Sequence, residues 1–222
     1  MEQKQKRFAE GICFSKLFWV FLITAVLGVL IETVYCRITD GVWMNRSGLI
    51  YGQMSIVWGL GGVALTLALT PLRRFGVIWG TLLVFLAGAV LGGAFECLCS
   101  LLTETLFGAV YWDYSAMKTS IFGGRTNLMY CVAWGLLSVA WVMLLYPGMS
   151  FLIERVPVRW GVIATRIIVP LFVIEFLFSG LIIRRYYERR TDTTPHNAVE
   201  AFLDTHYDDT TVEQRWPNMI NQ

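Results

Sequence analysis

Three long stretches of this sequence, residues 47–72, 75–95 and 126–147, contain no Lys, Arg, Asp or Glu. A helix needs about 20 residues to cross roughly 30 Å of hydrocarbon, so uncharged apolar runs of this length predict membrane-spanning helices. The 222-residue chain is 56% apolar and only 15% charged, which argues against a soluble enzyme, a nucleic-acid-binding domain or a secreted disulfide scaffold. Its net charge of +2 is too small to indicate a polyanionic partner such as nucleic acid.

The hydrophobic pattern predicts an all-α, polytopic membrane helical bundle. We expect about five transmembrane helices, at 17–36, 50–72, 75–102, 127–147 and 161–183. The third run continues past its predicted end to Trp112, and this extension would be a tilted helix end, an interfacial helix or a re-entrant segment that makes a sixth element. The first run, from Leu17 to Cys36, is longer than a signal-peptide core, which predicts an uncleaved span.

The distribution of charge divides the chain into a membrane part and a tail. We expect residues 1–187 to form the transmembrane bundle and residues 188–222 to form a polar C-terminal tail, with a short amphipathic helix over 198–207. Positively charged residues are equally numerous, eight each, on the two sides of the predicted topology. Because the first span usually dominates the orientation of a membrane protein, we expect the N-terminus to lie inside the cell.

The sequence contains an internal repeat. Gly28 to Glu32 and Gly92 to Glu96 are both Gly-x-x-x-Glu, at an offset of 64 residues. The Trp-Gly-Leu units that begin at Trp58 and Trp134 are offset by 76 residues. The spans therefore form two related hairpins plus one helix, and because two crossings return the chain to its starting side, the two copies share one orientation.

Three glutamates interrupt the apolar runs, and such residues in membrane spans are functional-site candidates because a carboxylate there is costly unless it is paired, hydrated or protonated. Glu32 and Glu96 fall late in the first and third spans, on the side where the long loops 37–49 and 103–126 open, and Glu175 lies near the middle of the fifth. This placement predicts a polar cavity that opens to one face of the membrane.

Arginines are the expected partners of these carboxylates. Arg46 and Arg125 lie on the long loops and Arg166 lies in the fifth span, and we predict at least one Glu–Arg contact among them. Such a contact would serve a solute site, or it would be a buried ion pair that only fixes helix register. The Gly-x-x-x stripes that precede Glu32 and Glu96 predict close helix–helix packing.

Aromatic and hydrogen-bonding residues surround the expected mouth of the cavity. Asp113, between Trp112 and Tyr114, suits either a loop lock or the binding of a cationic or hydroxylated ligand. The candidate substrate-binding residues are Glu32, Asn45, Arg46, Tyr51, Trp58, Glu96, Trp112, Asp113, Tyr114, Arg125, Asn127 and Glu175.

Catalytic and metal-binding signatures are missing from the sequence. It has no phosphate-binding loop motif, no Gly-x-Ser-x-Gly and no His-Glu-x-x-His. Its five cysteines lie in or beside apolar runs and both histidines lie in the tail. We therefore expect no enzyme activity, no cofactor and no metal.

Most of the chain resembles the ABC-transporter type IV permeases, a CmpB-like group of bacterial membrane proteins. The resemblance rests on Leu30 to Cys36, Asn45-Arg46, Tyr51-Gly52, Trp58-Gly59, Phe95-Glu96, Leu106 to Gly108, Trp112 to Ser115, Asn127, Trp134-Gly135 and the closing segments Phe202 to Asp204 and Trp216 to Met219. Family members carry prolines after the Tyr-Gly pair, where this chain has Gln53 and Ser55-Ile56. The expectation of a break at the start of the second span is weaker for that reason.

The resemblance implies a permease-like transport protein in the bacterial cytoplasmic membrane, with the lipid bilayer and an unknown small solute as partners and no nucleic acid. An ATPase, or another membrane subunit, would be a separate chain. Two alternatives remain open: a membrane scaffold or regulatory subunit without transport activity, and an intramembrane enzyme that uses Glu32 and Glu96 as acid and base.

Overall fold

The computed structural model describes residues 7–108, 110–191 and 194–217, and over these residues the chain is an all-α bundle, as predicted. Five of its helical segments are long and apolar enough to cross a membrane: Phe14–Thr39, Ile56–Phe75, Val77–Leu106, Leu128–Glu154 and Val158–Glu188. The number of spans predicted from the hydrophobic pattern is therefore confirmed.

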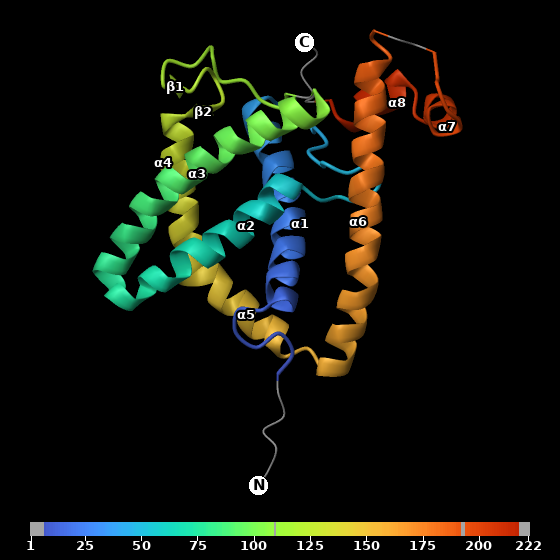
Figure 1. The fold of residues 1–222 in the computed structure, drawn as a ribbon. Coiled ribbons are helices and arrows are strands. Elements are labelled where there is room, and N and C mark those ends of the chain that lie inside the picture. The colour runs from blue at the N-terminus through green and yellow to red at the C-terminus, as the bar shows by residue number, and fades with distance from the viewer. Residues whose placement is uncertain (1–6, 109, 192–193, 218–222) are drawn as a thin grey trace.

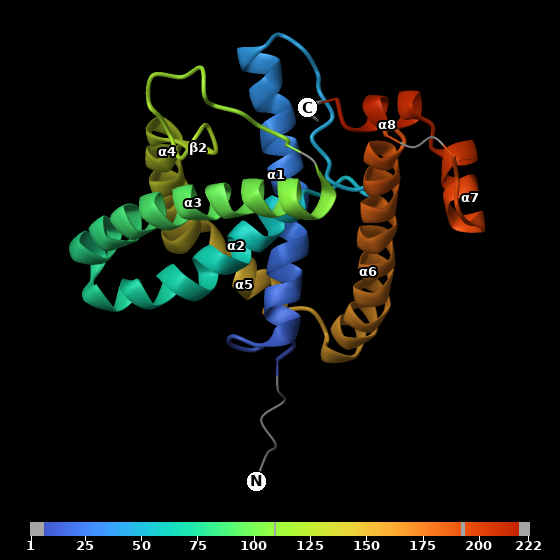
Figure 2. The same cartoon turned by 45° about the horizontal axis from the view of Figure 1, so that its top comes forward.

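The membrane segments are built from six α-helices and two irregular turns. The α-helices are α1 (Phe14–Thr39), α2 (Ile56–Leu69), α3 (Val77–Phe107), α4 (Leu128–Val139), α5 (Tyr146–Glu154) and α6 (Val158–Glu188). A 3-10 helix over Thr70–Phe75 ends the second segment, and a π-helical turn over Ala140–Leu145 joins α4 to α5. Helices α1 and α6 run in the same direction, whereas α2 and α3 are strongly inclined to them and project away from α6 (Figures 1 and 2).

The helix limits differ from the prediction at two places that matter for the site. The second span begins at Ile56 and not at residue 50, because residues 47–55 are not helical and Ser55 caps α2 by accepting a hydrogen bond from the Trp58 backbone N–H. Residues 47–55 thus interrupt the helix at the start of this span, although the chain has Gln53 and Ser55-Ile56 where the resemblance leads us to expect prolines. The extension of the third span is the end of α3 itself, which continues to Phe107 and stops at Gly108.

The internal repeat is visible in the packing of the two hairpins. A Cβ on Gly28 would overlap the indole of Trp58, and a Cβ on Gly92 would overlap the indole of Trp134. These two tryptophans are 76 residues apart and the two glycines 64 apart, as the repeat requires, and the indoles lie 5.7 Å from each other between ring centroids. The same glycines that the sequence marks as a packing stripe therefore let α1 contact α2 and α3 contact α4.

Equivalent prolines lie where the regular α-helix is interrupted in each hairpin. A proline lacks the N–H that would donate to the carbonyl four residues earlier, so the helix must change its pitch around it. Pro71 lies in the 3-10 helix, and Pro147 follows the π-helical turn. The main core is centred between the hairpins, where Val20 and its repeat equivalent Val84 are fully buried beside Trp141.

The polar parts of the chain gather at one end of the bundle (Figure 1). They comprise a small antiparallel hairpin of β1 (Ser120–Ile121) and β2 (Thr126–Asn127), and the tail helices α7 (Ala198–His206) and α8 (Asp209–Arg215). The amphipathic helix expected near residues 198–207 is α7, whereas α8 was not predicted. Residues 218–219 of the family-like closing segment lie outside the described residues.

Candidate functional site

Glu32 lies in an ion pair between the first span and the loop that follows it. The Arg46 Nε donates to Glu32 Oε2 at 2.7 Å, and the Trp58 indole N–H donates to Glu32 Oε1 at 2.5 Å. Both oxygens of the carboxylate are therefore paired, by one residue from the loop and one from α2. The side chains of Glu32 and Arg46 keep 28% and 18% exposure, so the pair lies at an accessible wall and not in the core. This is the Glu–Arg contact that the sequence predicts.

The loop between α1 and α2 passes from the end of α1 to the middle of α6 before α2 begins (Figure 2). At this depth its backbone groups need protein partners, since non-helical backbone is tolerated in a membrane only where protein or water satisfies it. Glu175 supplies one partner by accepting the backbone N–H groups of Tyr51 and Gly52 at 2.7 and 3.1 Å. Ser179, one turn further along α6, accepts the N–H of Ile50 at 2.9 Å.

The last turn of α8 holds the same loop from the other side. Arg215 donates to the carbonyl oxygens of Leu49 and Gly52 at 2.7 and 2.9 Å, and to the hydroxyl of Ser47 at 3.1 Å. The Asn45 side chain in turn donates to the backbone carbonyl of Arg215 at 3.1 Å. Desolvation lowers the pKa of Arg215, but a guanidinium remains charged at any physiological pH.

The hydroxyl of Tyr51 adds a further contact between the loop and the tail. It hydrogen-bonds the hydroxyl of Tyr207, and its ring stacks on Phe178 of α6. Burial raises the pKa of Tyr207 to about 12, with a further contribution from the bond to Tyr51, so the Tyr207 phenol stays protonated near pH 7. Tyr51 therefore closes the loop against α6 and the tail.

Glu96 occupies the equivalent place in the second hairpin but has different partners. It is 9% exposed and accepts the Tyr114 hydroxyl at 3.0 Å and the Thr126 hydroxyl at 2.7 Å. Burial raises the pKa of Tyr114, which keeps the phenol protonated as a donor. Glu96 thus fastens the long loop 108–127 to α3 and makes no ion pair among the described residues.

The rest of this second loop is locked by its own residues. Asp113 accepts the N–H and the hydroxyl of Ser115 at 2.8 and 3.0 Å, which lowers the pKa of Asp113. The Trp112 indole donates to the carbonyl of Arg125 at 3.0 Å, and the Arg125 side chain pairs with Glu104 at 2.5 Å. These bonds of Asp113 to Ser115 lie within the loop, and Asp113 does not line the polar cavity.

Asn127 joins the same loop to the fourth span. Its side-chain oxygen accepts the N–H of Met129 at 2.8 Å, which caps α4, and the hydroxyl of Thr119 at 2.8 Å. The residue is fully buried. Asn127 therefore acts as a helix cap.

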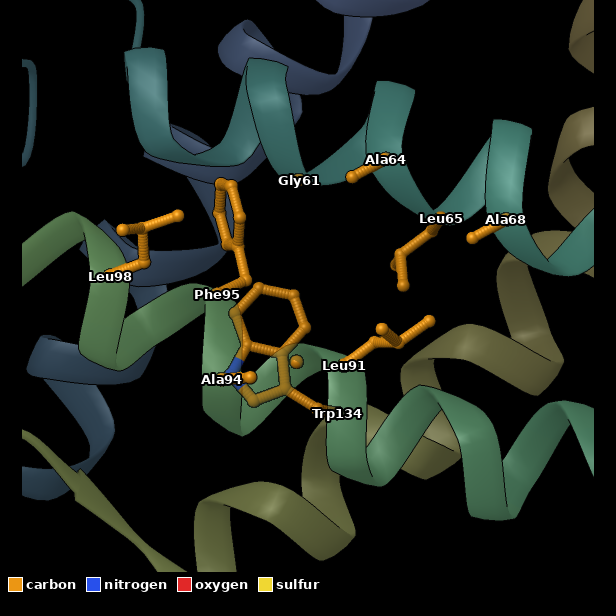
Figure 3. Close-up of a pocket in the computed structure, with 10 residues that line it drawn as sticks. Gly61, Ala64, Leu65, Ala68, Leu91, Ala94, Phe95, Leu98 and Trp134 are labelled. Carbon is orange, nitrogen blue, oxygen red and sulfur yellow. The ribbon is translucent and has the colours of Figure 1, made fainter. Parts of the chain in front are cut away.

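A cavity of about 240 Å³ lies among α1, α2, α3 and α6. Its wall is mostly apolar, and we call it the polar cavity only because the Glu32–Arg46 pair lies in that wall. Three of the twelve candidate residues line it, namely Glu32, Arg46 and Trp112. A second cavity, of about 250 Å³, lies between α2, α3 and Trp134 and is lined by apolar residues such as Leu65, Leu91 and Phe95 (Figure 3). Because Glu96 does not line the polar cavity, the two repeat-related glutamates do not share it.

Several residues of the site were not identified from the sequence. Ser47, Ser179 and Arg215 hold the first loop, and Tyr111 lines the polar cavity. A serine beside a glycine, such as Ser47, and an arginine in a polar tail, such as Arg215, are common in sequences. Neither indicates a binding role until the fold is known. Arg166, expected as a partner of a glutamate, is in none of the ion pairs within the described part of the chain.

Comparison with known proteins adds one result. A family model described as "Putative ABC-transporter type IV" matches residues 19–180, which is more than half of the chain and includes the second, third and fourth spans and most of the first and fifth. No curated protein and no solved structure matches the chain.

Proposed function

Because the chain belongs to the ABC-transporter type IV family, we propose that it is a permease-like component of small-solute transport in the bacterial cytoplasmic membrane. One observation carries the proposal: the polar cavity inside the helical bundle has the Glu32–Arg46 ion pair in its wall. Charged groups in membrane spans usually mark substrate or ion pathways, because their cost must be balanced by pairing or water. The solute would pass the Glu32–Arg46 pair on the side of the two long loops.

Energy coupling would come from outside this chain if the transport is ATP-driven. The sequence has no phosphate-binding loop motif, so an ATPase would be a separate subunit. At the end of the bundle opposite the long loops, only three residues separate α5 from α6 and only Gly76 separates the 3-10 helix from α3. These connections offer little docking surface, which gives a secondary or accessory mechanism comparable weight.

The proposal is tested by comparing two Glu-to-Gln variants that differ in their relation to the cavity. Glu32 and Glu104 both pair with an arginine, at 2.7 and 2.5 Å, but only Glu32 lines the polar cavity. Cells that lack the chain are complemented with wild type, Glu32→Gln or Glu104→Gln, and their small solutes are compared by mass spectrometry. We expect wild type and Glu104→Gln to restore the same solute levels, and Glu32→Gln to fail at equal protein abundance.

Full complementation by Glu32→Gln at equal abundance would contradict the transport proposal. It would favour a second candidate function, a membrane scaffold or regulatory subunit. The observation behind this second candidate is that nine of the twelve expected site residues do not line the polar cavity, and most of these nine hold loops or helix ends. For a scaffold, deleting residues 191–222 would remove a co-purifying membrane partner in mild detergent.

A further inference from the structure

Most of the wall of the polar cavity is hydrocarbon. Leu60 of α2, Leu102 and Leu106 of α3, and Phe176 and Ile183 of α6 all line it. A solute that is polar over its whole surface would leave these side chains against unfavourable water or polar groups. The composition of the wall therefore fits a ligand that is itself largely apolar.

The cavity is also open on its apolar side. Leu60, Leu102 and Leu106 are 48%, 47% and 63% exposed although they line it. All three lie in segments that are long and apolar enough to span a membrane, so the surface that they leave exposed is suited to contact with lipid. A volume of about 240 Å³ is smaller than the pockets of about 300–1,000 Å³ that enclose drug-sized ligands. The cavity thus holds one end of a molecule whose remainder extends into the bilayer.

The polar side chains of the cavity include hydrogen-bond donors that are not fully used, whereas its one carboxylate is fully used. Both oxygens of Glu32 already accept hydrogen bonds. Arg46 has N–H groups left over after its bonds to Glu32 and to the Met44 sulfur, and the Tyr111 hydroxyl has no hydrogen-bond partner among the residues described. Burial raises the pKa of Tyr111, so the phenol stays protonated. Donors of this kind recognise oxygen acceptors such as a carboxylate or a phosphate.

We propose that this cavity binds a membrane amphiphile with a carboxylate or phosphate head group, which enters sideways from the bilayer. Its head contacts Arg46 and Tyr111, and its chain lies against Leu60, Leu102 and Leu106. This inference rests on the proposed function in one respect, because it names the class of molecule that the transport cavity holds.

The experiment uses the full chain in nanodiscs of zwitterionic phospholipid with a photoreactive fatty acid as the probe. Cross-linked peptides are identified by mass spectrometry, and competition is measured with an alkyl phosphate and an alkanol of the same chain length. We expect cross-links within 56–60 and 99–106, competition by the phosphate, and competition by the alkanol that is weaker by about tenfold, since it lacks a charged acceptor. Competition by phosphatidic acid at a lower concentration than by unlabelled free fatty acid would identify a phospholipid as the source of the head group.

Matched variants separate specific binding from lipid that merely surrounds the protein. Leu60→Trp fills the cavity, whereas Leu67→Trp places the same ring on the same helix at a position that is 44% exposed and does not line the cavity. Tyr111→Phe removes one donor that has no partner to lose, so folding should be unaffected and binding of the fatty acid should weaken by about tenfold. Equal cross-linking in wild type and Leu60→Trp, or in wild type and Tyr111→Phe, would overturn the inference.

The two proposals fail separately. If Leu60→Trp and Tyr111→Phe reduce cross-linking but Glu32→Gln complements fully, the amphiphile site is supported and the transport role is rejected. If Glu32→Gln fails to restore solute levels but Leu60→Trp and Tyr111→Phe leave cross-linking unchanged, the transport role is supported and the amphiphile site is rejected.

Discussion

At the scale of single residues, the three membrane glutamates compensate their charge in three different ways. Glu32 accepts from an arginine and an indole, Glu96 accepts from two hydroxyls, and Glu175 accepts from two backbone N–H groups. The sequence indicates that each needs partners, because a lone carboxylate in an apolar run is costly. It does not indicate which partners, since Thr126 and the backbone of residues 51–52 become neighbours only through the fold.

A buried ion pair also lies at the end of the bundle opposite the long loops, where Lys16 pairs with Glu154. Lys16 is fully buried and donates to Glu154 at 2.6 Å and to the carbonyl of Ser150 at 3.4 Å. Glu154 keeps 20% exposure and has Arg7 within 3.9 Å as a second cation. Removing Glu154 would therefore leave a buried, unpaired ammonium, whereas removing Lys16 would leave a carboxylate that is partly exposed. The two losses of stability should differ.

We predict that Glu154→Gln destabilises the protein more than Lys16→Met. Glu154→Gln leaves a fully buried ammonium without its carboxylate, and breaking a buried pair in this way costs about 3 kcal/mol or more. Lys16→Met leaves a carboxylate that water and Arg7 still reach, and we expect a loss of about 1 kcal/mol. The free energy of unfolding in mixed detergent micelles measures both.

The double variant Lys16→Met/Glu154→Gln serves as the control. Because it carries no unpaired charge, it should be more stable than Glu154→Gln alone. Equal losses in the two single variants, or an additive double variant, would show that the pair has no energetic coupling.

At the scale of elements, the apolar runs locate all five spans but not their ends. Span ends depend on capping and on loop contacts: Ser55 sets the start of α2, and Gly108, in the left-handed region with φ 67°, ends α3. Neither effect changes the hydropathy of the run. By contrast, the Gly-x-x-x stripes give correct information about packing, since the residues that approach Gly28 and Gly92 are the two tryptophans of the repeat.

We predict that Gly28→Ala destabilises the first hairpin by about 1 to 3 kcal/mol, the usual cost of overpacking. The added Cβ would overlap the Trp58 side chain, and Trp58 must then move from the indole position that donates to Glu32. Thermal unfolding of the purified chain measures the loss, and intrinsic tryptophan fluorescence reports the displaced ring.

Gly148→Ala is the matched control for this variant. Gly148 lies in α5, and a Cβ there meets nothing within 4 Å. The change should be neutral or slightly stabilising because alanine has the higher helix propensity. Equal melting of Gly28→Ala and wild type would refute the close packing of α1 on α2.

At the scale of the whole molecule, the tail reaches back to the first loop. Arg185 of α6, which is 2% exposed, pairs with Asp204 of α7 at 2.7 Å, and Arg189 pairs with Asp204 at 2.8 Å and Asp209 at 2.7 Å. Through these pairs α7 and α8 are held on α6, where Arg215 contacts the loop beside the polar cavity. The sequence shows a polar tail with one amphipathic helix, but contacts between residues about 165 positions apart leave no local pattern.

The last prediction concerns pH. The neighbouring Arg185 side chain lowers the pKa of Asp204 below its ordinary 3.8, and the backbone N–H of His196 lowers that of Glu200 below its ordinary 4.5. A carboxyl group whose pKa is lower in the docked tail than in the undocked tail favours docking when it is ionised. Its full contribution is present at any pH above the undocked pKa, and it is lost as the pH falls through the docked pKa. We therefore expect the tail to stay docked at pH 7 and to loosen progressively below about pH 4.5.

Spin labels at Thr205 of α7 and Ile38 of α1, both exposed, test this in a cysteine-free background in nanodiscs. The distance distribution between the labels should be narrow at pH 7 and broad at pH 3. In the Asp204→Asn variant the distance distribution should already be broad at pH 7, because an amide lacks the charge that faces Arg185 and Arg189. Glu10→Gln is the control: Glu10 is exposed and lies outside the tail, so this variant should behave as wild type. A distribution that stays narrow at pH 3, or in Asp204→Asn, would mean that apolar contacts such as those of Trp216, which is 1% exposed, hold the tail without the ion pairs.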